Sequence, residues 1–201
     1  MSILGATDEK SNNDMRQNIG FFVGVDFYGY LTGEQNLDYF RRLKGIDDKN
    51  EVERVLEIVG LSGDPSKVPV KKYSLGMKQR LGIANALLGS PEILIFDEPT
   101  NGLDPQGIMD VRNMIQKINE ESGATIIISS HILSELQHTA HRFGMLYDGT
   151  VIRELSQEDL KEQTNMTSIN VANQDVEKAT KTLQEAGINI KSVEQATASL
   201  E

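Results

Sequence analysis

An unbroken apolar run, Ile93 to Phe96, ends in the adjacent carboxylates Asp97 and Glu98. Such a run, without polar alternation, predicts a strand that is covered on both faces in a parallel sheet. In open parallel sheets the ligand crevice lies at the carboxyl ends of the strands. Two carboxylates there can divide the work, because one can hold Mg²⁺ while the next orients and polarises a water. For the Asp-Glu pair alone, an acidic strand end that caps the next turn is the preferred explanation.

The segment before this strand predicts a helix whose start can bind an anion. Ser74 is placed to act as its N-cap, and Gly76 lets a phosphate approach the backbone closely. The free N–H groups and the dipole at a helix start attract negative charge. The buried face of this helix is formed by Leu81, Ile83, Ala84, Leu87 and Leu88. An ordinary capped core helix is the alternative, but the two features together, in this order and spacing, are highly specific.

A helix that starts at Pro105 and ends before Gly123 follows Asp104, and a second apolar strand, Ala124 to Ile128, comes next. A strand, helix and strand in succession form a right-handed parallel crossover, so both strands end on the same edge of the sheet. This topology predicts that His131, just after the second strand, lies beside Asp97 and Glu98. His138 and His141 are expected on the following helix, facing solvent.

Several segments together resemble one family. YSLGMKQRLGIA resembles the signature motif of the ATP-binding cassette (ABC) ATPases, ILIFDEP resembles their Walker B strand, and TNGLDP resembles their D-loop. SSHILSE, residues 129–135, is similar to their switch-histidine segment. Within the family, the sequence most resembles the ATP-binding subunits that export bacitracin- and lantibiotic-type peptides. The resemblance covers most of residues 1–155.

The resemblance implies an α/β fold with a P-loop NTPase-like core, a mainly parallel sheet and a helical subdomain at about residues 33–90. It implies ATP and Mg²⁺ as cofactors, and a dimer of ATP-binding subunits. The implied roles are Mg²⁺ binding for Asp97, action on the water for Glu98, and γ-phosphate contact for His131. In the second subunit's site, Ser74 and Gly76 are expected to bind the nucleotide, and Asp104 is expected to bridge the two sites.

The sequence departs from the family pattern at three places. Leu75 and Met77 replace a glycine and the glutamine of the common LSGGQ signature, a pattern that the resembled branch tolerates. No G-x-x-x-x-G-K-[ST] occurs in the 201 residues, so the phosphate-binding loop is absent from them. Near the family's water-sensing glutamine stand Gly24 and Asp26, and that role is carried over to neither residue.

These departures predict a chain that is truncated at its N-terminal end, and its last residues also resemble the approach to a further element. The expected domains are a partial ABC ATPase domain, 1–155, and a small C-terminal α/β appendage, 156–201. We expect that the chain by itself neither hydrolyses ATP nor behaves as a clean monomer, because nothing else in it replaces the loop that holds the nucleotide.

The remaining patterns predict further elements. Strands are expected at Met1–Gly5 and Ile19–Val25, and helices that open at Thr32, with Gln35 in a capping box, and at Asn50, with Glu53 three residues on. Asp148-Gly149 predicts a type I′ hairpin between 143–147 and 150–153. A capped helix is expected at 156–163, and a strand, helix and strand over 167–193.

Composition restricts the partners. The net charge of −10 disfavours a nucleic-acid partner, and the absence of cysteine excludes disulfides and cysteine-based metal sites. No apolar run approaches the ~20 residues of a membrane-spanning helix, so any link to a membrane must come through a partner. The resemblance implies a transmembrane permease as that partner and a place on the cytoplasmic face of the membrane. The residues from Phe27 to Tyr30 are candidates for that contact. Tyr28 and Tyr30 are equally explained as half-buried packing residues.

The sequence thus predicts an ATP-binding and ATP-hydrolysing subunit of an ABC transporter that exports a peptide antibiotic or a similar compound. One alternative is an ABC-type ATPase that serves ribosomes or DNA repair, although such proteins normally carry a tandem cassette or a long coiled-coil insertion. The other alternative is a non-catalytic fragment, which a test of ATP binding separates from the first. The sequence does not name the transported compound, because specificity resides in the membrane subunit.

Overall fold

The computed structural model describes residues 18–24, 26–164, 169, 171–188 and 190. Two compact units divide the chain between Phe143 and Gly144, and each is described by itself. The predicted strand at Met1–Gly5 lies outside the described residues. The division into domains 1–155 and 156–201 stays a prediction.

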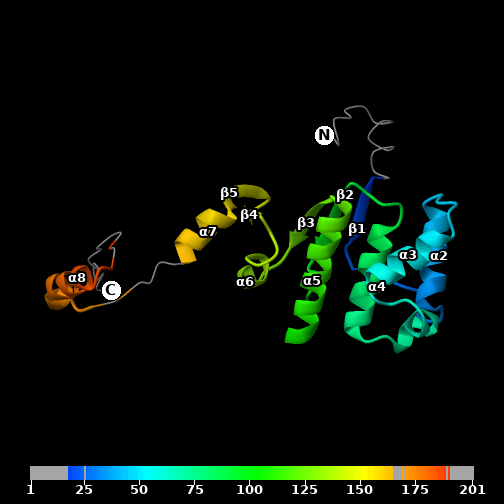
Figure 1. Ribbon diagram of the computed structural model, residues 1–201, viewed down its shortest axis with the longest axis horizontal. Coiled ribbons are helices and arrows are strands. Elements are labelled where there is room, and N and C mark those ends of the chain that lie inside the picture. Colours follow the sequence, from blue (N-terminus) through cyan, green and yellow to red (C-terminus); the bar gives the residue numbers. More distant parts are fainter. Residues whose placement is uncertain (1–17, 25, 165–168, 170, 189, 191–201) are drawn as a thin grey trace, which may run out of the picture. The chain divides into compact units, whose positions relative to one another are not determined.

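The first unit is built on a three-stranded parallel sheet in the order β1-β2-β3 (Figure 1). Its strands are β1 (Ile19–Phe22), β2 (Ile93–Asp97) and β3 (Thr125–Ser129). Phe96 lies between Phe22 and Ile128 in the register, and Asp97 pairs with Ser129. The predicted parallel crossover is confirmed. Strand β1 is shorter than predicted, because its pairing with β2 stops at Phe22 and the chain then turns at Gly24, which has a φ of 50°.

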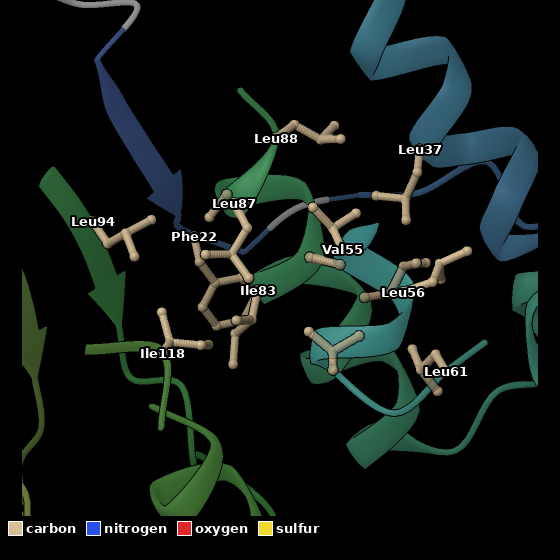
Figure 2. Close-up of a cluster of buried hydrophobic side chains, with 14 of the residues drawn as sticks. Phe22, Leu37, Val55, Leu56, Leu61, Ile83, Leu87, Leu88, Leu94 and Ile118 are labelled. Carbon is tan, nitrogen blue, oxygen red and sulfur yellow. The ribbon is translucent and has the colours of Figure 1, made fainter. Parts of the chain in front are cut away.

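Helices α4 (Leu75–Leu87) and α5 (Pro105–Ser122) bury one face of this sheet. Figure 2 shows Phe22 and Leu94 of the sheet beside Ile83 and Leu87 of α4 and Ile118 of α5. Full burial of one such side chain contributes roughly 1.5–3 kcal/mol, so this cluster is the main source of stability in the unit.

The opposite face of the sheet is open in the part of the chain that the structure describes. Phe21 is 48% exposed and Ile127 is 54% exposed. The predicted cover on both faces of the apolar strands is therefore present on one face only among the described residues. The apolar residues of β2 favour burial of both faces of the strand. How far each face is exposed depends on which elements pack against it.

Helices α2 (Gly33–Leu43) and α3 (Asn50–Ile58) pack with α4 at the other end of the core. The predicted capping box is confirmed, because the backbone N–H of Gln35 donates to Thr32 Oγ1 and the backbone N–H of Thr32 donates to Gln35 Oε1. The predicted start of α3 at Asn50 is confirmed. Lys49 is the N-cap residue and makes no side-chain cap bond, while Asp48 Oδ1 accepts from the N–H of Asn50.

Cationic side chains of α2 and α3 secure the end of α4. Lys44 Nζ donates to the carbonyl oxygens of Asn85 at 3.1 Å and Leu88 at 3.2 Å, and Arg54 donates to that of Leu87 at 3.1 Å. The last carbonyls of a helix lack partners within it and favour positive charge. Burial lowers the pKa of Lys44. These contacts fix the direction of α4, and hence the place of its N-terminus.

The second unit contains a hairpin of β4 (Arg142–Tyr147) and β5 (Thr150–Ser156). Asp148 and Gly149 both have positive φ, as the predicted type I′ turn requires. Helix α7 (Gln157–Thr164) follows, and the Asp159 N–H donates to Ser156 Oγ at its start, which confirms the predicted cap.

Helix α8 (Val176–Glu185) confirms the helix predicted within 167–193. The strands predicted on either side lie largely outside the described residues, and their described residues are not in a strand. Ile169, Val171, Ile188 and Ile190 lie outside any strand of the described chain, and the first three are exposed. Alternating apolar residues favour a strand only when a partner strand pairs with them. The predicted appendage is therefore helical in its described part.

Among the residues that the structure describes, none of the helices has the combination of length and apolar character that a membrane crossing needs.

The close approach of β1 to α4 generates a prediction. A Cβ added at Gly20 would lie 2.0 Å from the carbonyl oxygen of Ala86, so the strand or the helix must shift. We expect Gly20→Ala to lower the free energy of unfolding by roughly 1–3 kcal/mol, as overpacking does. Urea denaturation of the purified protein measures this change.

The control is Gly144→Ala, a strand glycine whose added Cβ has its nearest neighbour, Val151 Cγ1, at 3.9 Å. This variant should stay within about 0.5 kcal/mol of the wild type. Equal midpoints for the two variants would contradict the close packing of β1 on α4.

Candidate functional site

The carboxyl ends of β2 and β3 bring a group of polar side chains together. Asp97 closes β2, and Glu98 follows it with a φ of 48°. A left-handed backbone at a residue other than glycine costs about 1–2 kcal/mol, so surrounding contacts must hold it. Conformations of this kind concentrate at functional sites.

His131 contacts the Glu98 carboxylate directly. Its Nδ1 lies 2.9 Å from Oε2 and 3.0 Å from Oε1 of Glu98. Since an ionised carboxylate only accepts hydrogen bonds, Nδ1 carries the proton in this arrangement. The His131 side chain is 65% exposed, and the contact leaves Nε2 for a further partner. The predicted proximity of His131 and Glu98 is confirmed.

Ser129 joins the two carboxylate residues, and the sequence analysis assigned it no role. Its hydroxyl donates to Asp97 Oδ1 at 2.5 Å and accepts from the backbone N–H of Glu98 at 3.0 Å. The contact of Ser129 follows from the parallel register, which pairs Ser129 with Asp97. That register follows from the predicted crossover once the strand bounds are known.

A second contact ties the loop after Glu98 to the segment after His131. Thr100 Oγ1 donates to Glu135 Oε2 at 2.6 Å. Glu135 lies on α6 (Leu133–Leu136), which ends before His138. The two later histidines, His138 and His141, are therefore exposed as predicted but do not lie on that helix.

The N-terminus of α4 has the predicted serine cap. Ser74 is the N-cap, and its Oγ accepts from the Met77 N–H at 3.2 Å. A Cβ added at Gly76 would meet only Leu103 Cδ2, at 3.8 Å. The packing of the described residues therefore leaves room beside Gly76.

Asp104 caps α5. Its Oδ1 accepts from the Gly107 N–H at 3.0 Å, and Pro105 occupies the first turn. The loop before Asp104 lies against α4, because Gln79 Nε2 donates to the carbonyl oxygen of Asn101 at 3.4 Å. Asp104 and the N-terminus of α4 are thus linked through this loop.

The structure separates the predicted site residues into two groups. Asp97, Glu98 and His131 form one group at the sheet edge. Ser74, Gly76 and Asp104 belong to the other, around the start of α4. In the described ranges no hydrogen bond or ion pair joins Ser74 to Asp97, Glu98 or His131. The assignment of the two groups to different nucleotides stays a prediction.

The donor set at the sheet edge fits Mg²⁺ bound together with a nucleotide. No cluster of three or more metal-binding side chains occurs in the described part of the chain. Mg²⁺ is usually held by one or two carboxylates together with phosphate oxygens and water. Asp97, as a single carboxylate ligand at a strand end, meets that requirement.

The position at which the family has its water-sensing glutamine is assigned to no residue of this chain. Gly24 has a φ of 50°, and Asp26 is exposed. Neither residue contacts Asp97, Glu98 or His131 through a hydrogen bond in the described structure. No water-sensing role follows for either residue.

Comparison with known proteins places this site in a family. The family model for the ABC transporter matches residues 5–101. The uncharacterized ABC transporter ATP-binding protein YhcH of Bacillus subtilis is 36% identical over 228 residues, which cover 99% of this chain and 74% of that protein. The chain belongs to the ABC transporter family.

Two further relatives define the branch. The bacitracin transport ATP-binding protein BcrA of Bacillus licheniformis is 45% identical over 164 residues, 81% of this chain and 53% of that protein. The lantibiotic transport ATP-binding protein SrtF of Streptococcus pyogenes is 44% identical over 153 residues, 76% of this chain and 66% of that protein. The chain spans about half the length of the bacitracin relatives that it matches.

A solved structure supports the fold. The dimeric, post-hydrolysis state of the ATP-binding cassette MJ0796, bound to ADP and Pi, matches with a TM-score of 0.63 and 25% identity. The match covers 76% of this chain and 69% of that one. The predicted fold class, an α/β ABC ATPase core with a parallel sheet and helices, is confirmed.

The capping role of Asp104 generates a prediction. We expect Asp104→Ala to lower the free energy of unfolding by about 1 kcal/mol, because the Gly107 N–H loses its acceptor. Asp104→Asn, which retains a side-chain oxygen, should leave the stability unchanged. Urea denaturation compares the two variants, and equal losses in both would show that the cap does not stabilise α5.

Proposed function

We propose that the protein is the ATP-binding and ATP-hydrolysing subunit of an ABC transporter that exports a peptide antibiotic or a similar compound. The observation that carries the proposal is the contact of His131 with Glu98, directly after Asp97 at the end of β2. Family membership supports it, and the names of the bacitracin and lantibiotic relatives support the class of transported compound.

The residues at the sheet edge have distinct roles in this proposal. Asp97 holds Mg²⁺, which neutralises charge on the phosphates when it is bound. Glu98 accepts a hydrogen bond from the attacking water and orients it. His131 contacts Glu98 through Nδ1, and in the imidazolium form of the ring Nε2–H donates to a γ-phosphate oxygen. Catalysis then rests on positioning and charge stabilisation, without a covalent intermediate.

A second copy of the protein completes each site. Ser74 and the backbone at Gly76 bind the γ-phosphate of the nucleotide that the other copy holds, and Asp104 bridges the two sites. The room beside Gly76 supports this division. The 201 residues contain no G-x-x-x-x-G-K-[ST], so the contacts of that loop are assigned to none of them.

A transmembrane permease is the proposed partner at the membrane's cytoplasmic face. Its contact is an aromatic cluster of Tyr28, Tyr30 and Tyr39, in which the ring of Tyr28 lies 6.0 Å from that of Tyr30 and 5.3 Å from that of Tyr39. Tyr30 is 72% exposed. Exposed aromatic side chains are enriched at interfaces, which favours the contact over simple packing.

The function predicts the behaviour of Glu98→Gln. We expect ATP turnover to fall roughly 10²–10³-fold while ATP binding persists, because the amide cannot orient the water as the carboxylate does. The variant should accumulate as an ATP-bound dimer, which size-exclusion chromatography with ATP detects. The assay uses the protein produced from its complete reading frame.

Glu120→Gln, an exposed change on α5, is the matched control and should keep wild-type turnover. Wild-type turnover in Glu98→Gln would overturn the role of Glu98. Absence of ATP binding by the unmutated protein would instead support the non-catalytic alternative.

The permease contact predicts a separate effect. Tyr30→Glu places a charge in the aromatic cluster, and we expect ATP turnover to become independent of transport in membranes that contain the permease. ATP turnover by the isolated subunit, measured without the permease, should not change. Tyr147→Glu, at an equally exposed tyrosine of the second unit, is the control. Coupling that survives Tyr30→Glu and Tyr28→Glu would place the contact elsewhere.

A further inference from the structure

The hydroxyl of Ser129 has two partners, and both belong to the carboxylate pair. It donates to Asp97 Oδ1 at 2.5 Å and accepts from the Glu98 N–H at 3.0 Å. The first distance lies in the range of a charge-assisted bond between a hydroxyl and an ionised oxygen. One side chain on β3 therefore contacts the last residue of β2 and the residue that follows it.

The bond to the Glu98 N–H acts on a strained residue. Glu98 has a φ of 48°, and relaxation to an ordinary conformation would rotate its carboxylate away from His131. Two backbone groups of Glu98 are held, because its N–H donates to Ser129 and its carbonyl accepts from the Asn101 N–H at 3.1 Å. The first of these bonds is the one that a single side-chain substitution can remove.

The bond to Asp97 acts on the carboxylate that is expected to meet the cation. With Oδ1 fixed by the hydroxyl, the rotation of the carboxylate is set and Oδ2 remains for another ligand. Groups that orient a metal ligand in this way affect metal affinity, typically by a factor of 10–100.

We propose that Ser129 is a positioning residue that sets the Asp97 carboxylate and the Glu98 backbone relative to each other. The inference rests on the proposed ATPase function, and it assigns to Ser129 the alignment of the Mg²⁺ ligand with the residue that orients the water. Ser129 acts through these two residues and touches neither ATP nor water in the proposal.

The neighbouring serine provides a matched control. Ser130 Oγ accepts from the Ile132 N–H at 3.1 Å, and it makes no hydrogen bond to Asp97 or Glu98 in the described structure. Ser129→Ala removes both a donor and an acceptor, whereas Ser129→Thr retains the hydroxyl. Ser130→Ala removes a hydroxyl of the same kind one residue away.

The test uses the protein from its complete reading frame and three measurements. Hydrogen exchange of the Glu98 amide, followed by NMR, reports the bond to Ser129 without any need for activity. Mn²⁺ affinity in the presence of ADP, measured by electron paramagnetic resonance, reports the Asp97 carboxylate. Steady-state kinetics separate kcat from the KM for ATP.

For Ser129→Ala we expect faster exchange of the Glu98 amide, about 10-fold weaker Mn²⁺ binding and a kcat about 10²-fold lower, since small misplacements of reacting groups have effects of that size. The KM for ATP should change little. Ser129→Thr should restore all three quantities, and Ser130→Ala should match the wild type. If Ser129→Ala does not fold, Ser129→Cys, with a weak acceptor of similar volume, should change each quantity in the same direction.

Unchanged amide exchange and Mn²⁺ affinity in Ser129→Ala would overturn the inference, as would equal effects in Ser129→Ala and Ser130→Ala. These outcomes are distinct from a failure of the proposed function. An unmutated protein that binds but does not hydrolyse ATP would contradict the proposed function, while the exchange measurement would still decide whether Ser129 holds Glu98.

Discussion

The parallel pairing of β2 with β3 is the interaction on which the candidate site depends. It places Asp97 opposite Ser129 and lets the chain continue from each strand end into a polar loop at the same edge. The Glu98 contact with His131 and the Thr100 contact with Glu135 both cross this edge. A shift of the register by one residue would turn every side chain of β3 to the other face and remove these contacts.

The helical part of the first unit fixes the second group of site residues. Helix α4 is held at one end by the buried contact with β1 and by Lys44, whose ammonium group binds its last carbonyls. Its other end is then free to present Ser74 and Gly76. The same packing that stabilises the core therefore sets the direction in which the N–H groups of α4 point.

Several site residues stabilise the fold and are also proposed to bind ligand. Ser74 and Asp104 are the N-caps of their helices. The Ser74 hydroxyl and one carboxylate oxygen of Asp104 each accept a hydrogen bond from one backbone N–H. An Asp cap retains a second oxygen, and a helix start retains further free N–H groups. Local stability and ligand binding are thus compatible at these positions.

The sequence by itself determined the elements with strong local signals: the apolar strands, the helices with caps at Thr32 and Ser74, the helix start at Pro105, and the turn at Asp148. The parallel crossover then predicted the place of His131, because it puts the ends of β2 and β3 on the same edge of the sheet. The tertiary structure decided the rest. The described residues around α8 form no strand, and the described residues leave one face of the sheet open. Pairing and cover depend on neighbours that a local pattern does not encode. The role of Ser129 likewise depends on a register that emerges only when two distant segments pair.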